Sequence, residues 1–137
     1  MVKELNMDQI LRFQADQITF EPCDDENVAH VFLRSTTPPQ KHYLMINRSV
    51  DSRKKSEIFL EYDDQSKVAR GGVAKCQLRD ASLTLEIEEV TAEALGIPEV
   101  RCIIIDFDLG WAPLRELGHS LSAIFADFGV YEDRSQE

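Results

Sequence analysis

The hydrophobic pattern of this chain changes its period once, near residue 110. Before that point apolar residues recur at every second position in short segments, and after it they recur at every third or fourth position. The clearest early segment has Leu83, Leu85 and Ile87 alternating with threonine and glutamate, which is typical of a strand with one face in water. The pattern therefore predicts strands followed by one helix, which is an α+β fold.

Seven segments with strand character precede the helix. They are residues 11–21, 28–33, 42–48, 57–63, 73–78, 83–88 and 100–107. The alternation slips between Ala15 and Ile18, which indicates either a bulge or two separate strands. The segment 100–107 is apolar on both faces, which predicts a strand buried on both sides. Polar turns and the pair Gly71-Gly72 separate the segments, so we expect six to seven mostly antiparallel strands in a meander-like sheet.

The last element is predicted to be an amphipathic helix of about 16 residues. Its apolar side chains are Leu114, Leu117, Leu121, Ile124, Phe125 and Phe128. Glycine weakens a helix interior, so Gly118 predicts a close contact at that position. The apolar faces of the helix and the strands should pack together. The expected core contains Leu83, Leu85, Ile87, Ile103, Ile105, Leu117, Leu121 and Phe125.

The 137 residues fit one domain, with a frayed start at residues 1–10 and a polar tail at residues 131–137. No stretch of 18 apolar residues is present, and the first ten residues lack the apolar segment of a signal peptide. We therefore expect a cytoplasmic protein without a membrane-spanning helix.

Acidic residues outnumber basic residues by 25 to 15, which gives a net charge of −10. This charge repels nucleic acid and anionic membranes, so neither is an expected partner. It would steer the approach of a basic protein. The alternative is that the charge only keeps the domain soluble.

Residue types that carry chemistry are present but scattered. Three cysteines (Cys23, Cys76 and Cys102) and three histidines (His30, His42 and His119) lack the spacing of a zinc site. Asp106 and Asp108 share a strand face, where they either hold Mg²⁺ with added waters or end the strand. The chain has no nucleophile elbow and no phosphate-binding loop. We expect no catalytic residues, no cofactor and no metal site, with the Asp106 and Asp108 pair left open.

The acidic residues cluster in segments 24–26, 57–64 and 86–93. If these segments are adjacent in the sheet, they form one negative face, which needs solvent or a cationic partner. The predicted partner-binding residues are Asp24, Asp25, Glu57, Glu61, Asp63, Asp64, Glu86, Glu88 and Trp111. Trp111 is either an exposed anchor or a staple between the helix start and the sheet. Arg48 ends a strand and is a candidate for an internal pairing.

Several short segments match a known pattern in their order and spacing. They are Tyr43-Leu44-Met45-Ile46-Asn47-Arg48, the acidic strand Glu57 to Tyr62 with Asp63-Asp64-Gln65, Gly71-Gly72 before residues 73–78, Leu83-x-Leu85, Ile103-Ile104-Ile105-Asp106 and the helix end Ala123-Ile124-Phe125. On these residues, which span roughly 11–126, the chain resembles the immunity protein 10 family of bacterial polymorphic toxin systems. Asn47 stands where the family favours glutamine in a Tyr-Leu-x-x-Gln-Arg strand.

The resemblance implies a cytoplasmic antidote that binds a cognate toxin domain and has no catalytic residues. An acidic surface would suit a nuclease toxin, whose substrate-binding groove is basic. One alternative is a general interaction module or a homo-oligomeric scaffold such as a homodimer, which an apolar sheet face or edge would favour. A second is a hydrolase without a recognisable motif, which a deep pocket holding a carboxyl of raised pKa would favour.

Overall fold

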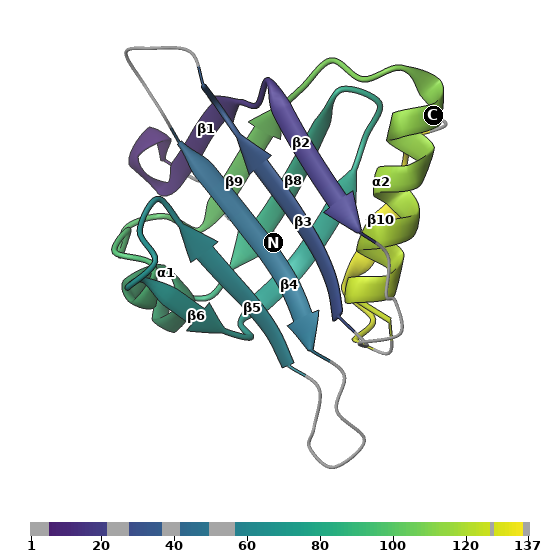
Figure 1. The fold of residues 1–137 in the computed structure, drawn as a ribbon. Coiled ribbons are helices and arrows are strands. Elements are labelled where there is room, and N and C mark those ends of the chain that lie inside the picture. The colour runs from purple at the N-terminus through teal and green to yellow at the C-terminus, as the bar shows by residue number, and fades with distance from the viewer. Residues whose placement is uncertain (1–5, 22–27, 37–41, 50–56, 127, 136–137) are drawn as a thin grey trace.

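A computed structural model of the chain describes residues 6–21, 28–36, 42–49, 57–126 and 128–135. Within these residues, ten strands form two five-stranded sheets (Figure 1). The first, called the meander sheet, has the order β2 (Gln17–Glu21), β3 (Val28–Arg34), β4 (Tyr43–Ser49), β5 (Glu57–Tyr62) and β6 (Val68–Arg70). The second, called the mixed sheet, has the order β1 (Ile10–Gln14), β9 (Cys102–Asp106), β8 (Ser82–Ile87), β7 (Val73–Leu78) and β10 (Tyr131–Asp133).

The α+β class and the mostly antiparallel pairing are confirmed, but the prediction of one sheet with six to seven strands is wrong. In the described residues, β1 pairs with β9 and β10 pairs with β7 in parallel, whereas the other strand pairs are antiparallel. A single helix is about 10 Å wide and covers only part of a sheet of seven strands, which is roughly 29 Å wide. The apolar strand faces are instead buried against each other, as in a β-sandwich.

The chain passes between the sheets at two corners. At the first, the Ala15 amide donates to the Asp106 carbonyl of the mixed sheet (2.8 Å), and the next amide, of Asp16, donates to Arg34 of the meander sheet (3.0 Å). The slip in the sequence pattern is thus two strands, β1 and β2, in different sheets.

The second corner is the glycine pair between β6 and β7. The Gly71 amide donates to the Ile58 carbonyl (2.7 Å) in the meander sheet, while the Gly72 carbonyl accepts from Glu88 (2.9 Å), just after β8. Both glycines have positive φ, and a Cβ on Gly72 would lie 1.6 Å from the Thr91 Oγ1. This corner therefore requires glycine at position 72 for space as well as for conformation.

The core lies between the sheets, whose strands cross in Figure 1. All eight residues predicted for the core are buried: Leu83, Leu85, Ile87, Ile103, Ile105, Leu117, Leu121 and Phe125. The meander sheet contributes Leu33, Leu44, Ile46 and Leu60 to the same cluster. The expectation that segment 100–107 is buried on both sides is confirmed on the outward side at Cys102, which is buried, but is wrong at Ile104, which is only half-buried.

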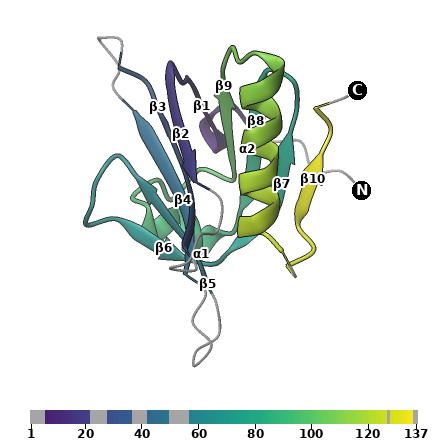
Figure 2. The same ribbon diagram turned by 45° about the vertical axis from the view of Figure 1, so that its right-hand side comes forward.

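The helix α2 (Trp111–Ile124) closes one side of the sandwich. It packs against β2, β3 and β4 and also against β10, which Figure 2 shows beside it. Gly118 makes the close contact that the sequence predicted, because a Cβ there would lie 2.9 Å from the Asp133 Oδ2. The segment expected as a polar tail thus includes the strand β10. At the other side, the short helix α1 (Glu89–Ala94) packs against β6.

Arg48, at the end of the strand in the family-like motif, is buried. Its Nη1 donates to the carbonyl oxygens of Ala126 (2.7 Å), Ala123 (3.3 Å) and Ile124 (3.3 Å), at the end of α2. The last carbonyls of a helix lack partners within the helix, and a cation there also complements the helix dipole. Arg48 is therefore paired internally and joins the meander sheet to α2.

A short 3₁₀ turn (Met7–Gln9) precedes β1. Among the described residues, no helix combines the length and apolar character that crossing a membrane requires.

Candidate partner-binding surface

Large apolar side chains lie on the outer face of the meander sheet. Phe32, Tyr43, Met45 and Phe59 are each half-buried and alternate along their strands with fully or nearly buried residues. We call these four residues the aromatic face. They come from three neighbouring strands, β3, β4 and β5, which the meander connections bring together.

Strand register brings the members of the aromatic face together. Phe32 lies opposite Met45, and Met45 lies opposite Glu61. The rings of Phe32 and Tyr43 are 5.3 Å apart between centroids, within the range of an aromatic pair. Polar and charged side chains surround this centre, among them Gln17, Thr19, His30, Arg34, Asn47, Glu57 and Glu61. The result is an apolar centre with a polar rim.

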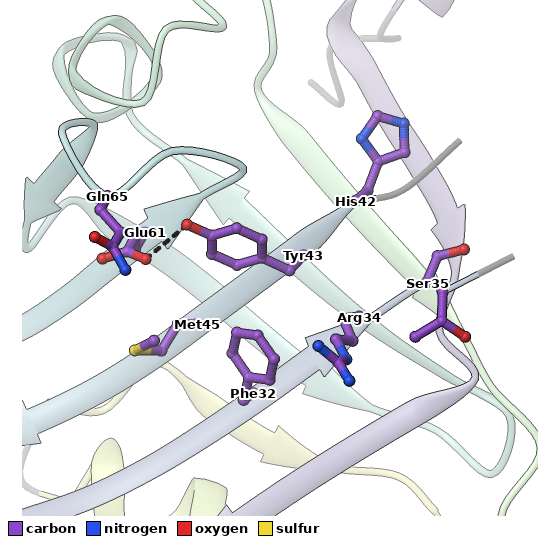
Figure 3. Close-up of a pocket in the computed structure, with 9 residues that line it drawn as sticks. Phe32, Arg34, Ser35, His42, Tyr43, Met45, Glu61 and Gln65 are labelled. Carbon is purple, nitrogen blue, oxygen red and sulfur yellow. Dashed lines mark hydrogen bonds between the residues drawn. The ribbon is translucent and has the colours of Figure 1, made fainter. Parts of the chain in front are cut away.

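Two hollows adjoin on this face. The first has a volume of about 480 Å³ and runs from Arg34 to Glu61, with Phe32, Tyr43 and Met45 in its lining (Figure 3). The second, of about 580 Å³, is lined by Thr19, His30, Phe32, Met45 and Asn47. Because the two share Phe32 and Met45, they form one continuous depression.

One end of the first hollow is acidic. The Tyr43 hydroxyl donates to the Glu61 Oε2 at 2.7 Å. Burial, this hydrogen bond and the charges of Glu61, Asp63 and Asp64 raise the pKa of Tyr43 to about 12. Asp63 has a positive φ, accepts from the Tyr43 amide and lies 2.7 Å from the His42 Nδ1. Asp63 therefore orders the turn after β5, and Glu61 supplies the carboxylate that faces the hollow.

Two arginines already stand over rings of this face. The Arg34 guanidinium lies 6.0 Å from the centroid of Phe32, and Arg34 Nε donates to the Gln17 Oε1 at 2.7 Å. The Arg70 guanidinium lies 5.7 Å from the centroid of Phe59. The ring faces of the meander sheet are thus accessible to cations.

The structure does not bring the predicted acidic residues into one patch. Glu57 and Glu61 lie on the outer face of the meander sheet, whereas Glu86 is exposed on the outer face of the mixed sheet. These outer faces point away from each other, because the inner faces share one core. Glu88 precedes α1.

Of the remaining predicted residues, Asp64 lies in the turn after β5, beside Asp63, and Trp111 lies on α2. The Asp64 carboxylate accepts hydrogen bonds from Ser66, which lower its pKa. Trp111 begins α2 and is 57% exposed. Asp24 and Asp25 lie outside the described residues.

Sequence reasoning missed Phe32, Met45 and Phe59 as candidate surface residues. The available signal was position: each lies on the strand face opposite the residues that form the core. A large apolar residue at such a position is unusual for a face that only contacts water. The acidic residues carry charge, whereas these apolar residues provide contact area.

The described residues offer little support for metal or acid chemistry. Arg12 holds the Asp106 carboxylate through two hydrogen bonds of 2.7 and 2.9 Å. No group of three histidine, cysteine, aspartate or glutamate side chains suited to a metal is present in this part of the chain. The carboxyl groups with shifted pKa values, Asp64 and Glu132, are shifted downward. Burial raises the pKa of the Cys76 and Cys102 thiols.

Comparison with known proteins gives one match. The sequence model described as immunity protein 10 matches residues 14–110, which is more than half of the chain. These residues include β2 to β9 and so contain the whole aromatic face. Neither a curated protein nor a solved structure matches the chain.

Proposed function

The chain belongs to the immunity protein 10 family, and from this premise we propose that it neutralises a cognate toxin domain by binding it through the aromatic face. Family membership makes it an immunity protein with a toxin as partner. The use of the aromatic face is our inference from the geometry.

The observation that supports this surface is its composition. Aromatic residues, methionine and arginine are enriched where proteins bind each other, and contact energy concentrates near the centre of an interface. Phe32, Tyr43 and Met45 lie at the centre of the aromatic face, and Arg34 and Glu61 lie at its rim. The side chains of this face are half-buried, and removing their remaining apolar surface from water would favour binding.

Net charge suggests which kind of toxin is bound. A chain with a charge of −10 attracts a basic partner and accelerates the encounter. A nuclease has a basic groove for its substrate, so we propose a nuclease as the toxin class. Glu57 and Glu61 lie beside the aromatic face and would pair with basic residues of that groove.

A second candidate function is supported by the same surface. An apolar sheet face also favours a homo-oligomeric scaffold, in which a second copy of this chain covers the aromatic face. A sedimentation measurement on the protein alone separates the two, because a dimer that dissociates on substitution of Phe32 would assign the face to self-association.

The function is tested by calorimetric titration of the protein with its cognate toxin domain. We expect tight 1:1 binding that abolishes the toxin's activity. Phe32→Ala should weaken binding by about 2 kcal/mol or more, which is roughly 30-fold. Ile104→Ala is the matched control, because Ile104 is a half-buried apolar residue on the outer face of the mixed sheet.

The control should leave binding unchanged while costing a similar amount of stability. Equal losses of affinity from both variants would remove the aromatic face from the proposal. An absence of binding at micromolar concentrations would remove the pairing with that toxin.

A further inference from the structure

We propose that the first hollow of the aromatic face binds an arginine side chain of the toxin domain, with Glu61 as its ion-pair partner. This inference rests on the proposed function and names the chemical group that the hollow recognises. Three observations support it: the shape of the hollow, the hydrogen-bond and ion-pair partners of Glu61, and the contacts between arginines and rings on this face.

The hollow has separate positive and negative ends. Figure 3 shows Arg34 at one end and Glu61 at the other, with the rings of Phe32 and Tyr43 between them. Its volume of about 480 Å³ is large enough to admit an arginine side chain. The aliphatic stem of an arginine would lie on Met45 and the rings, as such stems commonly do on apolar surface.

Glu61 has capacity for a further partner. Its Oε2 accepts from Tyr43, and no lysine, arginine or histidine among the described residues lies within ion-pair distance of its carboxylate. The neighbouring Asp63 carboxylate, in contrast, accepts from the Tyr43 amide and lies 2.7 Å from the His42 Nδ1. Glu61 is thus the carboxylate of this hollow that a partner's cation can satisfy.

The rings favour arginine over lysine. A guanidinium is planar, so it stacks on an aromatic face while its N–H groups donate to a carboxylate. The chain itself places Arg34 over Phe32 and Arg70 over Phe59. Tyr43 offers the remaining ring of the hollow, and its hydroxyl is fixed beside Glu61. A guanidinium over Tyr43 would therefore reach both the ring and the carboxylate.

A small probe tests the hollow without the toxin. The ¹⁵N-labelled protein is titrated with N-acetyl-arginine methylamide and, in parallel, with the citrulline analogue, which has the same shape without the charge. We expect saturable amide shifts at Tyr43, Met45 and Glu61 with millimolar affinity for arginine and at least tenfold weaker binding for citrulline. Equal binding of both probes, or shifts centred elsewhere, would overturn the proposal.

Glu61→Gln supplies the second test, and Glu86→Gln is its matched control. Both remove one charge from the outer face of a sheet, but Glu86 is on the mixed sheet, away from the aromatic face. We expect Glu61→Gln to weaken both the arginine probe and the toxin domain by roughly tenfold, and Glu86→Gln to change each by less than twofold. Tight toxin binding that is unaffected by Glu61→Gln would refute the arginine assignment but leave the immunity function intact.

The two proposals can fail separately. If the arginine probe binds at the hollow and the toxin does not bind, the hollow recognises a guanidinium but the toxin assignment is wrong. If the toxin binds and the probe shows no shifts, the toxin uses other chemistry on this protein.

Discussion

The outer faces of the two sheets carry different kinds of side chains. On the mixed sheet, polar side chains satisfy one another: Arg12 binds Asp106, and Gln77 donates to the Glu132 Oε2 at 2.9 Å. On the meander sheet, the central positions are held by Phe32 and Met45, whose carbon surface has no such partner within the sheet.

This difference bears on which of the two faces would gain free energy on binding a partner. A face whose polar side chains already bind one another loses solvation when it is covered and gains little. A face with apolar carbon at its centre and charges at its rim gains from burial and retains specificity through its polar groups. This contrast supports the proposal that the meander sheet contacts the toxin and that the mixed sheet faces solvent.

The most damaging change to this arrangement is at the corner that separates the faces. Gly72→Ala would place a Cβ 1.6 Å from the Thr91 Oγ1 in a residue with a φ of +79°. We expect a loss of about 3 kcal/mol or more in the free energy of unfolding, because overpacking adds to backbone strain. Urea denaturation measures the loss.

Gly71→Ala is the control for that substitution. Its φ is also positive, but a Cβ there would meet no atom within 4 Å. It should cost only about 1–2 kcal/mol, the strain of a left-handed backbone. Equal losses from the two variants would show that space at Gly72 does not matter.

An intermediate effect is expected from charge reversal. Changing Glu57 and Glu61 to lysine should slow association with a basic toxin roughly tenfold and make the rate less dependent on salt. Changing Glu86 and Glu88 alters net charge by the same amount away from the aromatic face and should slow association less. Stopped-flow rates at several salt concentrations make the comparison, and equal slowing would assign steering to net charge alone.

The smallest expected effect is on the titration of one phenol. The raised pKa of Tyr43, about 12, means that the folded protein holds this proton more tightly than the unfolded chain, whose tyrosines titrate near about 10. The stabilisation is thus complete below pH 10 and is lost as the pH rises through about 12. Absorbance at alkaline pH follows the phenolate.

Glu61→Gln should lower the pKa of Tyr43, because it removes a charge and weakens a hydrogen bond. Tyr131 serves as the internal control, because its pKa is raised by burial and by Asp133, beside the mixed sheet. An unchanged pKa of Tyr43 in this variant would show that Glu61 does not contribute to the raised pKa.

The sequence predicted on which strand face several residues of the candidate site lie, but not that they form a binding surface. The sequence placed Tyr43 and Met45 on the face opposite Leu44 and Ile46, and the structure keeps that alternation. It could not show that Phe32 of β3 lies directly opposite Met45, because the register between two strands depends on hydrogen bonds that no single segment specifies. The acidic segments were separated for the same reason, since β5 and β8 belong to different sheets.

Local pattern determined the inner face of each strand, the helix α2, the slip at Ala15 and the need for glycine near residue 72. These features depend on side-chain period and backbone freedom, which neighbouring residues define. Tertiary structure alone decided that the strands form two sheets, that β1 joins β9 in parallel across the length of the chain, and that residues 131–133 form an edge strand. Such pairings form only when the core has brought distant segments together, so no local pattern encodes them.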